Sequence, residues 1–219
     1  MAIVSGFGTQ TRTRHFDLAS ARALPYRASG PGQRQTNAMI FPLFRRSAQA
    51  PTISTLYGMI VAQARLPCFY RDYAVADTVN GRFDLIVLHL ALVLDRLAQE
   101  GALQSLGQGV FDRFCQDMDD NLREIGIADI KVPKEMQRMG EAFYGRAQAY
   151  RAALATNDDA ALMAALERNI YGGEPGRAAR RLAAYMREAL RGLAGQDASR
   201  LAGGELHFPD PALVPETAL

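Results

Sequence analysis

The sequence predicts an all-α protein, a single helical-bundle domain of about six helices with a buried central helix. Apolar residues recur with the 3.6-residue period of a helix from Pro51 onward, and no useful length shows the two-residue alternation of a strand. Prolines, glycines and capping residues separate the periodic segments. Hydrophobic residues make up 48% of the 219 residues, which is enough for a core.

The first 50 residues differ from the rest of the chain. They contain seven arginines and a single acid, Asp17, while the remaining residues are mildly acidic. Residues 1–38 show few apolar positions and no periodicity, a composition typical of disorder. We therefore expect a disordered basic extension over residues 1–50, a helical domain over 51–210 and a tail over 211–219. The extension is either a leader that resembles a transit peptide or sequence upstream of a true start at Met39, the explanation that we favour.

A first helix is predicted over residues 52–65, followed by a connector over 69–81. The next helix, over 82–99, is apolar all round its middle, so we expect it to be buried on every side. Its apolar run, residues 85–94, spans ten residues, whereas a membrane span needs about 20, so no transmembrane helix is expected. Cys68 and Cys115 have no metal or redox spacing and indicate reduced thiols in a cytosolic compartment.

Four more helices complete the bundle. A helix over 103–125 carries an apolar stripe that includes Met118, Leu122 and Ile125. The others are expected to begin near Pro133, at residues 156–159 and at residues 174–175, and the last of them to end near Gly195. Gly140 and Gly145 would let a neighbouring helix approach closely. The C-terminal tail is expected to dock Leu206 and Phe208.

Acidic residues cluster at the end of the 103–125 helix. Asp117, Asp120 and Glu124 share one face with Arg113, while Asp119 and Arg123 have the i, i+4 spacing of an ion pair. A di-metal bundle would need Glu-x-x-His motifs, and none of the three histidines follows an acid by three residues. We therefore interpret this region as a surface that faces a partner. Its candidate residues are Asp117, Asp120, Arg123, Glu124, Asp129, Lys131 and Lys134.

The last predicted helix has one apolar side and one arginine stripe. The stripe could bind an acidic surface such as RNA phosphate, a lipid headgroup or carboxylates, or it could be an ordinary solvated face. Its members are Arg177, Arg180, Arg181, Arg187 and Arg191.

His89 lies within the buried central helix. It is interpreted as a core histidine bonded to a backbone or side-chain acceptor. A haem or quinone ligand, a general base, or the partner of a cysteine nucleophile remain alternatives. The chain has no G-x-S-x-G, P-loop or G-x-G-x-x-G motif, so no enzyme class and no cofactor is indicated.

Three ordered segments resemble the ubiquinol–cytochrome c reductase (bc1 complex) chaperone family. They are "PCFYRDYAVADTVNGRFDLIVLHLALVLDRL" (67–97), "FDRFCQDMDDNLREIGIADIKVPKEMQRMGEAFYGRAQAY" (111–150) and "ERNIY" (167–171).

The resemblance implies a helical assembly factor without catalytic activity or cofactor that binds newly made cytochrome b. It further implies a place near the ribosomal exit tunnel and a small partner subunit. We expect no DNA partner and a location in the cytoplasm, peripheral on the inner membrane, or on the matrix side in a mitochondrion. The alternative from another class is a small-molecule carrier that binds quinone or haem around His89, Tyr144 and Tyr150.

Overall fold

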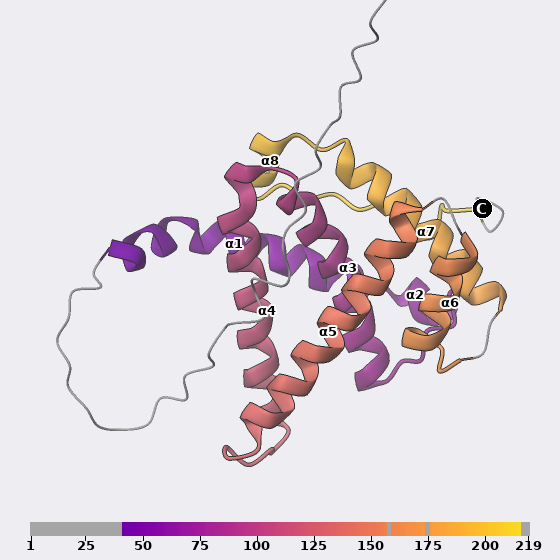
Figure 1. Ribbon diagram of the computed structural model, residues 1–219, viewed down its shortest axis with the longest axis horizontal. Helices are drawn as coiled ribbons and strands as arrows, with labels where there is room; N and C mark the ends of the chain where they lie inside the picture. Colours follow the sequence, from indigo (N-terminus) through magenta and orange to yellow (C-terminus); the bar gives the residue numbers. More distant parts are fainter. Residues whose placement is uncertain (1–40, 157–158, 174–175, 216–219) are drawn as a thin grey trace, which may run out of the picture.

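The computed structural model describes residues 41–156, 159–173 and 176–215, with side chains from residue 49 onward. These residues form helices, turns and irregular segments without a strand, which confirms the all-α class (Figure 1). The helices are α1 (Phe41–Ala64), α2 (Pro67–Arg71), α3 (Val79–Ala98), the 3-10 helix η2 (Gly101–Leu103), α4 (Gln104–Glu124), α5 (Val132–Ala155), α6 (Asp159–Ile170), α7 (Arg177–Ala194) and α8 (Ala198–Ala202).

α1 begins at Phe41 rather than at residue 52, because Pro51 lies inside the helix instead of ahead of it. A proline lacks the N–H of one helical hydrogen bond, but the helix can continue on both sides of it. The disordered extension expected over residues 1–50 is therefore wrong for residues 41–50, which are helical, and residues 1–40 lie outside the described residues. So do the side chains of residues 41–48.

The expected connector over residues 69–81 overlaps a short helix, α2, which begins two residues before it. Pro67 at its first turn favours helix initiation, and Cys68 and Phe69 are buried against the core. The chain then runs to Thr78, whose hydroxyl accepts a hydrogen bond from the backbone N–H of Gly81 (3.1 Å) and caps α3. The sequence interpretation missed α2 because five residues are too few to show a helical period.

α3 is the buried central helix that the sequence predicts. It packs against α1, α4, α5, α6 and α7, and its leucines from Leu85 to Leu97 are almost wholly buried. Figure 1 shows it crossing the middle of the molecule between α4 and α7, with α5 running across it. No helix in the described part of the chain is long and apolar enough to cross a bilayer.

The remaining helices pack around α3. α4 and α5 form an antiparallel hairpin, and α5 continues into α6 and α7, which pack against each other. Gly140 and Gly145 admit no close helix: a Cβ at either position would meet nothing within 4 Å among the described residues. The close approach lies instead at Gly109, where Ile53 of α1 packs against α4. The tail docks as expected, since Leu206 is buried and the Phe208 ring packs against the His89 ring.

We predict opposite effects for two alanine substitutions at helical glycines. Gly81→Ala would place a Cβ 2.0 Å from the backbone oxygen of Ala76, so α3 or the preceding link must shift, and we expect a loss of about 2–4 kcal/mol. Gly58→Ala meets nothing within 4 Å on the exposed side of α1 and should stabilise the protein by up to ~1 kcal/mol. Urea unfolding of both variants measures the difference, and equal stabilities would contradict this account.

Candidate partner-binding site

The turn between α4 and α5 projects beyond the other helices at one end of the molecule (Figure 1). α4 ends in a Schellman motif: the N–H of Gly126 donates to the Arg123 carbonyl and that of Ile127 donates to the Leu122 carbonyl, both at 3.0 Å. Gly126 has a φ of 85°, a conformation that favours glycine. We call residues 120–134 the hairpin tip.

Two of the acids of α4 are fixed by internal contacts. The Asp117 carboxylate accepts a hydrogen bond from the Tyr57 hydroxyl of α1 (2.8 Å) and lies 3.9 Å from Arg113. Asp119 pairs with Arg123 (2.7 Å), and Arg123 also contacts Asp129 across the turn. Asp117 therefore ties α4 to α1, and Arg123 stiffens the hairpin tip.

The other charged residues of the hairpin tip are directed to solvent. Asp120, Glu124, Lys131 and Lys134 are exposed, and within the described residues none of them forms a side-chain ion pair or hydrogen bond. The seven candidate residues thus lie on one hairpin, with Asp117 in a structural role and with Arg123 and Asp129 paired to each other.

Exposed isoleucines are the feature that the sequence interpretation missed. Ile125, expected in the core stripe, is 69% exposed, and Ile130 is 88% exposed. The stripe leaves the core because the last turn of α4 extends past the other helices, which a helical period cannot reveal. The hairpin tip therefore combines two apolar side chains with free charges of both signs, a composition typical of a protein-binding surface.

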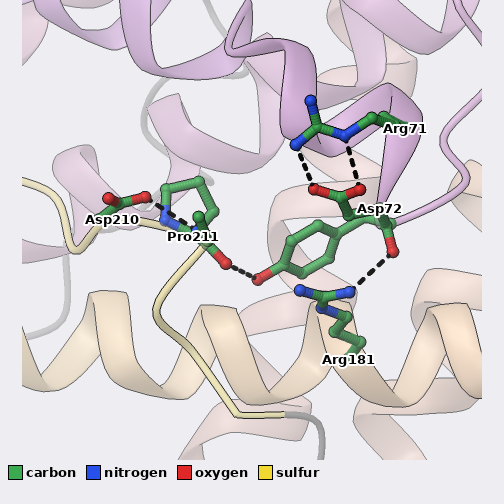
Figure 2. A network of polar contacts seen from close by, with 7 residues as sticks. Arg71, Asp72, Arg181, Asp210 and Pro211 are labelled. Carbon is green, nitrogen blue, oxygen red and sulfur yellow. Dashed lines mark hydrogen bonds and ion pairs between the residues drawn. The ribbon is translucent and has the colours of Figure 1, made fainter.

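The arginine stripe of α7 is largely used within the molecule. Arg187 pairs with Asp159 of α6, and Arg191 pairs with Glu188 of α7. Arg181 lies over the Tyr73 ring (4.6 Å to its centroid) and donates to the backbone carbonyl of Asp72 (3.1 Å). Figure 2 shows Arg181 reaching from α7 to Asp72, beside the Arg71–Asp72 ion pair.

Arg177 and Arg180 lie at the N-terminal end of the stripe. Both are exposed on the first turn of α7. Binding of an acidic partner by the stripe stays a prediction, and it concerns this end of the helix.

His89 is wholly buried, and both of its ring nitrogens are used. Nδ1 lies 2.7 Å from the Leu85 carbonyl, which can only accept, so Nδ1 carries the proton. Nε2 then accepts from the Tyr185 hydroxyl (2.9 Å), and Tyr185 in turn accepts from Gln63 of α1 (3.0 Å). Burial lowers the pKa of His89 to about 4, which keeps the ring neutral.

The other candidate chemistry is not brought together. The His89 ring contacts Phe69, Tyr185 and Phe208, whereas Tyr144 packs with Phe111 and Phe143 in a separate aromatic cluster. Burial raises the pKa of Cys115 to about 11 and also raises that of Cys68, which reduces the thiolate needed for attack. Among the described residues no group of three or more His, Cys, Asp or Glu side chains could hold a metal ion.

We predict that His89 makes the stability of the protein fall in mild acid. Its folded-state pKa of about 4 lies below the unfolded value of 6.5, so the unfolded chain binds the proton first as the pH falls. Between pH 7.5 and pH 4.5 this should cost about 2–3 kcal/mol.

The control is His89→Gln, which keeps a donor and an acceptor but does not titrate. Asp84, whose pKa burial raises to about 6, gives an opposite trend in both proteins, so the difference between them isolates His89. Parallel pH profiles of urea unfolding for the two proteins would contradict the assignment.

Comparison with known proteins gives consistent matches. The chain is 28% identical over 116 residues to the ubiquinol-cytochrome-c reductase complex assembly factor 1 of Xenopus laevis, a match that covers 52% of this chain and 58% of that protein. The chain therefore spans a little over half the length of this relative. A solved structure, the crystal structure of the Cbp3 homolog from Brucella abortus, matches with a TM-score of 0.71 and 40% identity. That match covers 81% of this chain and 100% of the other.

The family-level comparison spans most of the described domain. The model of the family described as ubiquinol-cytochrome C chaperone matches residues 71–208, from the end of α2 to the docked tail. This range includes the central helix, the hairpin tip and α7. The chain belongs to the ubiquinol-cytochrome c chaperone family.

Proposed function

We propose that this protein assists assembly of the respiratory bc1 complex by binding newly made cytochrome b through the hairpin tip, without catalysing a reaction. Membership of the chaperone family supports the assembly role, as does the name of the Xenopus laevis relative. The observation that carries the proposal is the exposure of Ile125 and Ile130 beside unpaired charges on a projecting hairpin within the matched range.

The chemistry of the hairpin tip suits a membrane-protein client. Membrane-spanning segments are apolar, and the loops beside them on one side of the bilayer are rich in Lys and Arg. Ile125 and Ile130 offer apolar contacts to a membrane-spanning segment. Asp120 and Glu124 offer unpaired carboxylates to the basic loop beside it. Lys131 and Lys134 would exclude clients whose flanking residues place like charges against them.

The remaining partners belong to the same proposal. The exposed Arg177 and Arg180 would supply a contact to ribosomal RNA near the exit tunnel, where cytochrome b emerges. A small partner subunit would share the hairpin surface. The protein would act in the compartment where cytochrome b is translated, at the surface of the membrane that receives it.

A deletion strain tests the proposal directly. Loss of the protein should lower the amounts of cytochrome b and assembled bc1 complex, and a plasmid copy of the full chain should restore both. Normal accumulation of the bc1 complex in the deletion strain would refute the assembly role.

Charge reversal at the hairpin tip should abolish client capture without unfolding the domain. In Asp120→Lys/Glu124→Lys, we expect at least a tenfold loss of cytochrome b that co-purifies with the tagged chain, because two unpaired carboxylates become like charges toward a basic segment. The melting temperature should change by less than about 3 °C, since neither side chain has a partner to lose.

The matched control is Asp77→Lys/Glu188→Lys, which makes the same change in net charge elsewhere on the surface. These acids pair only with the exposed arginines Arg82 and Arg191, so their loss should cost little stability. Equal loss of capture in the control would mean that net charge, not the hairpin tip, governs binding. A large fall in melting temperature for the tip variant would assign its acids a structural role.

The isoleucines provide an independent test. Ile125→Ser/Ile130→Ser should reduce cytochrome b capture several-fold and leave thermal stability unchanged, because both side chains are already in water. Val79→Ser removes an apolar side chain of similar exposure, 80%, at the start of α3 and away from the tip. Capture that falls equally in both variants would show that the apolar contact is not localised to the hairpin tip.

A further inference from the structure

Residues 205–214 follow α8 as a strap that lies across the helices. Residues 205–210 have no regular secondary structure, and 211–214 form a turn. The strap is held by side chains of three elements of the body: Gln63 of α1, Tyr73 beyond the end of α2, and Gln196 beyond the end of α7. We call the surface beneath it the strap groove.

The side chains of the strap groove donate hydrogen bonds to main-chain carbonyls of the strap. Gln196 donates to the His207 carbonyl (2.8 Å), Gln63 donates to the Pro209 carbonyl (3.1 Å), and the Tyr73 hydroxyl donates to the Pro211 carbonyl (2.6 Å). Figure 2 shows Pro211 with its carbonyl turned toward the end of α2. The three carbonyls belong to alternate residues, and in an extended chain the carbonyls of alternate residues point to the same side.

The side chains of the strap occupy an aromatic surface. The Phe208 ring meets the His89 ring edge-on, with centroids 5.2 Å apart, and Leu206 and Pro211 are buried. The His89 ring also packs against the rings of Phe69 and Tyr185. An aromatic surface with hydrogen-bond donors aimed at carbonyls is how proteins bind extended, proline-containing segments, whose prolines have no N–H to donate.

We propose that the strap groove is a second polypeptide-binding site, which takes an extended, proline-containing apolar segment of another protein in exchange for the strap. That this incoming segment belongs to the client, cytochrome b, rests on the proposed function above. The existence of the groove does not rest on that function. Its donors contact main-chain carbonyls, so the groove would accept any segment that places apolar side chains between such carbonyls. The strap thus acts as a tethered competitor that keeps the groove closed until such a segment arrives.

The groove also limits what can replace the strap. When the strap leaves, the Tyr73 hydroxyl and one N–H of Gln63 lose their acceptors, while the second N–H of Gln63 stays on Tyr185. An incoming segment must therefore present carbonyls at the same alternate spacing. A regular helix cannot, since its interior carbonyls are already bonded within the helix.

Binding of a labelled peptide with the sequence of residues 204–215 tests the proposal on purified full-length protein, with no cytochrome b present. In Leu206→Ser/Phe208→Ser the tethered strap is weakened while the groove is intact, so the peptide should bind at least tenfold more tightly than to the wild-type chain. Adding Tyr73→Phe to this variant removes one donor and should weaken binding about fivefold. A peptide that carries serine in place of its own phenylalanine is the matched control.

Three results would overturn the proposal. One is a folded strap variant that binds the peptide no better than the wild-type chain. Another is a wild-type dimer formed by exchange of straps, since the occupant would then be a second copy of this chain. The third comes from native-state hydrogen exchange of the wild-type protein, which remains decisive if the strap variant fails to fold.

In that experiment the amide of His207, bonded to Gln196 (2.9 Å), should exchange through a local opening at least a hundredfold faster than amides of α3. Exchange of both only through global unfolding would show that the strap never leaves the groove. Because cytochrome b capture is measured separately, failure here leaves the proposed function standing, and failure of capture leaves the groove standing.

Discussion

A buried chain of hydrogen bonds determines how the bundle is assembled. It runs from the Leu85 carbonyl through the neutral ring of His89 to the hydroxyl of Tyr185, and from there through Gln63 to the Pro209 carbonyl. Each N–H and O–H of this chain has one acceptor, so the central helix carries a polar side chain at zero exposure without the cost of an unsatisfied buried group. Since the chain crosses from α3 to α7 and α1, these three helices must assemble together, and the strap docks on its last member, Gln63.

The sequence was sufficient for features that depend on one helix at a time. The apolar circumference of α3 and the start of α5 near Pro133, at Val132 in the structure, follow from periodicity and capping. Features that depend on two helices were not accessible. A helical wheel groups Asp117 with Asp120, yet Tyr57, 60 residues away, fixes one and leaves the other in water. It also places Arg181 on the exposed arginine stripe, whereas its guanidinium donates to the carbonyl of Asp72, just after the end of α2.

The division between paired and unpaired charges links the fold to the proposed function. Burial and internal partners account for His89, for Asp117 and for most of the α7 arginines, so these groups hold helices together. What remains open on the α4–α5 hairpin is a small surface of two isoleucines and four unpaired charges. A chaperone for a membrane protein needs apolar side chains that contact the apolar segments of its client and charges that favour or exclude the residues flanking them. It needs no reactive group. The strap groove adds a second surface whose contacts are to main chain.

In-cell photo-crosslinking tests the central claim most directly, that the hairpin tip contacts the client. A photoreactive amino acid would replace Ile130, and in a second strain Val79, which is similarly exposed (88% and 80%) but lies at the start of α3. The account predicts that cytochrome b crosslinks to position 130 during synthesis of the bc1 complex and does not crosslink to position 79. Crosslinks to cytochrome b from position 79 and none from position 130 would contradict it.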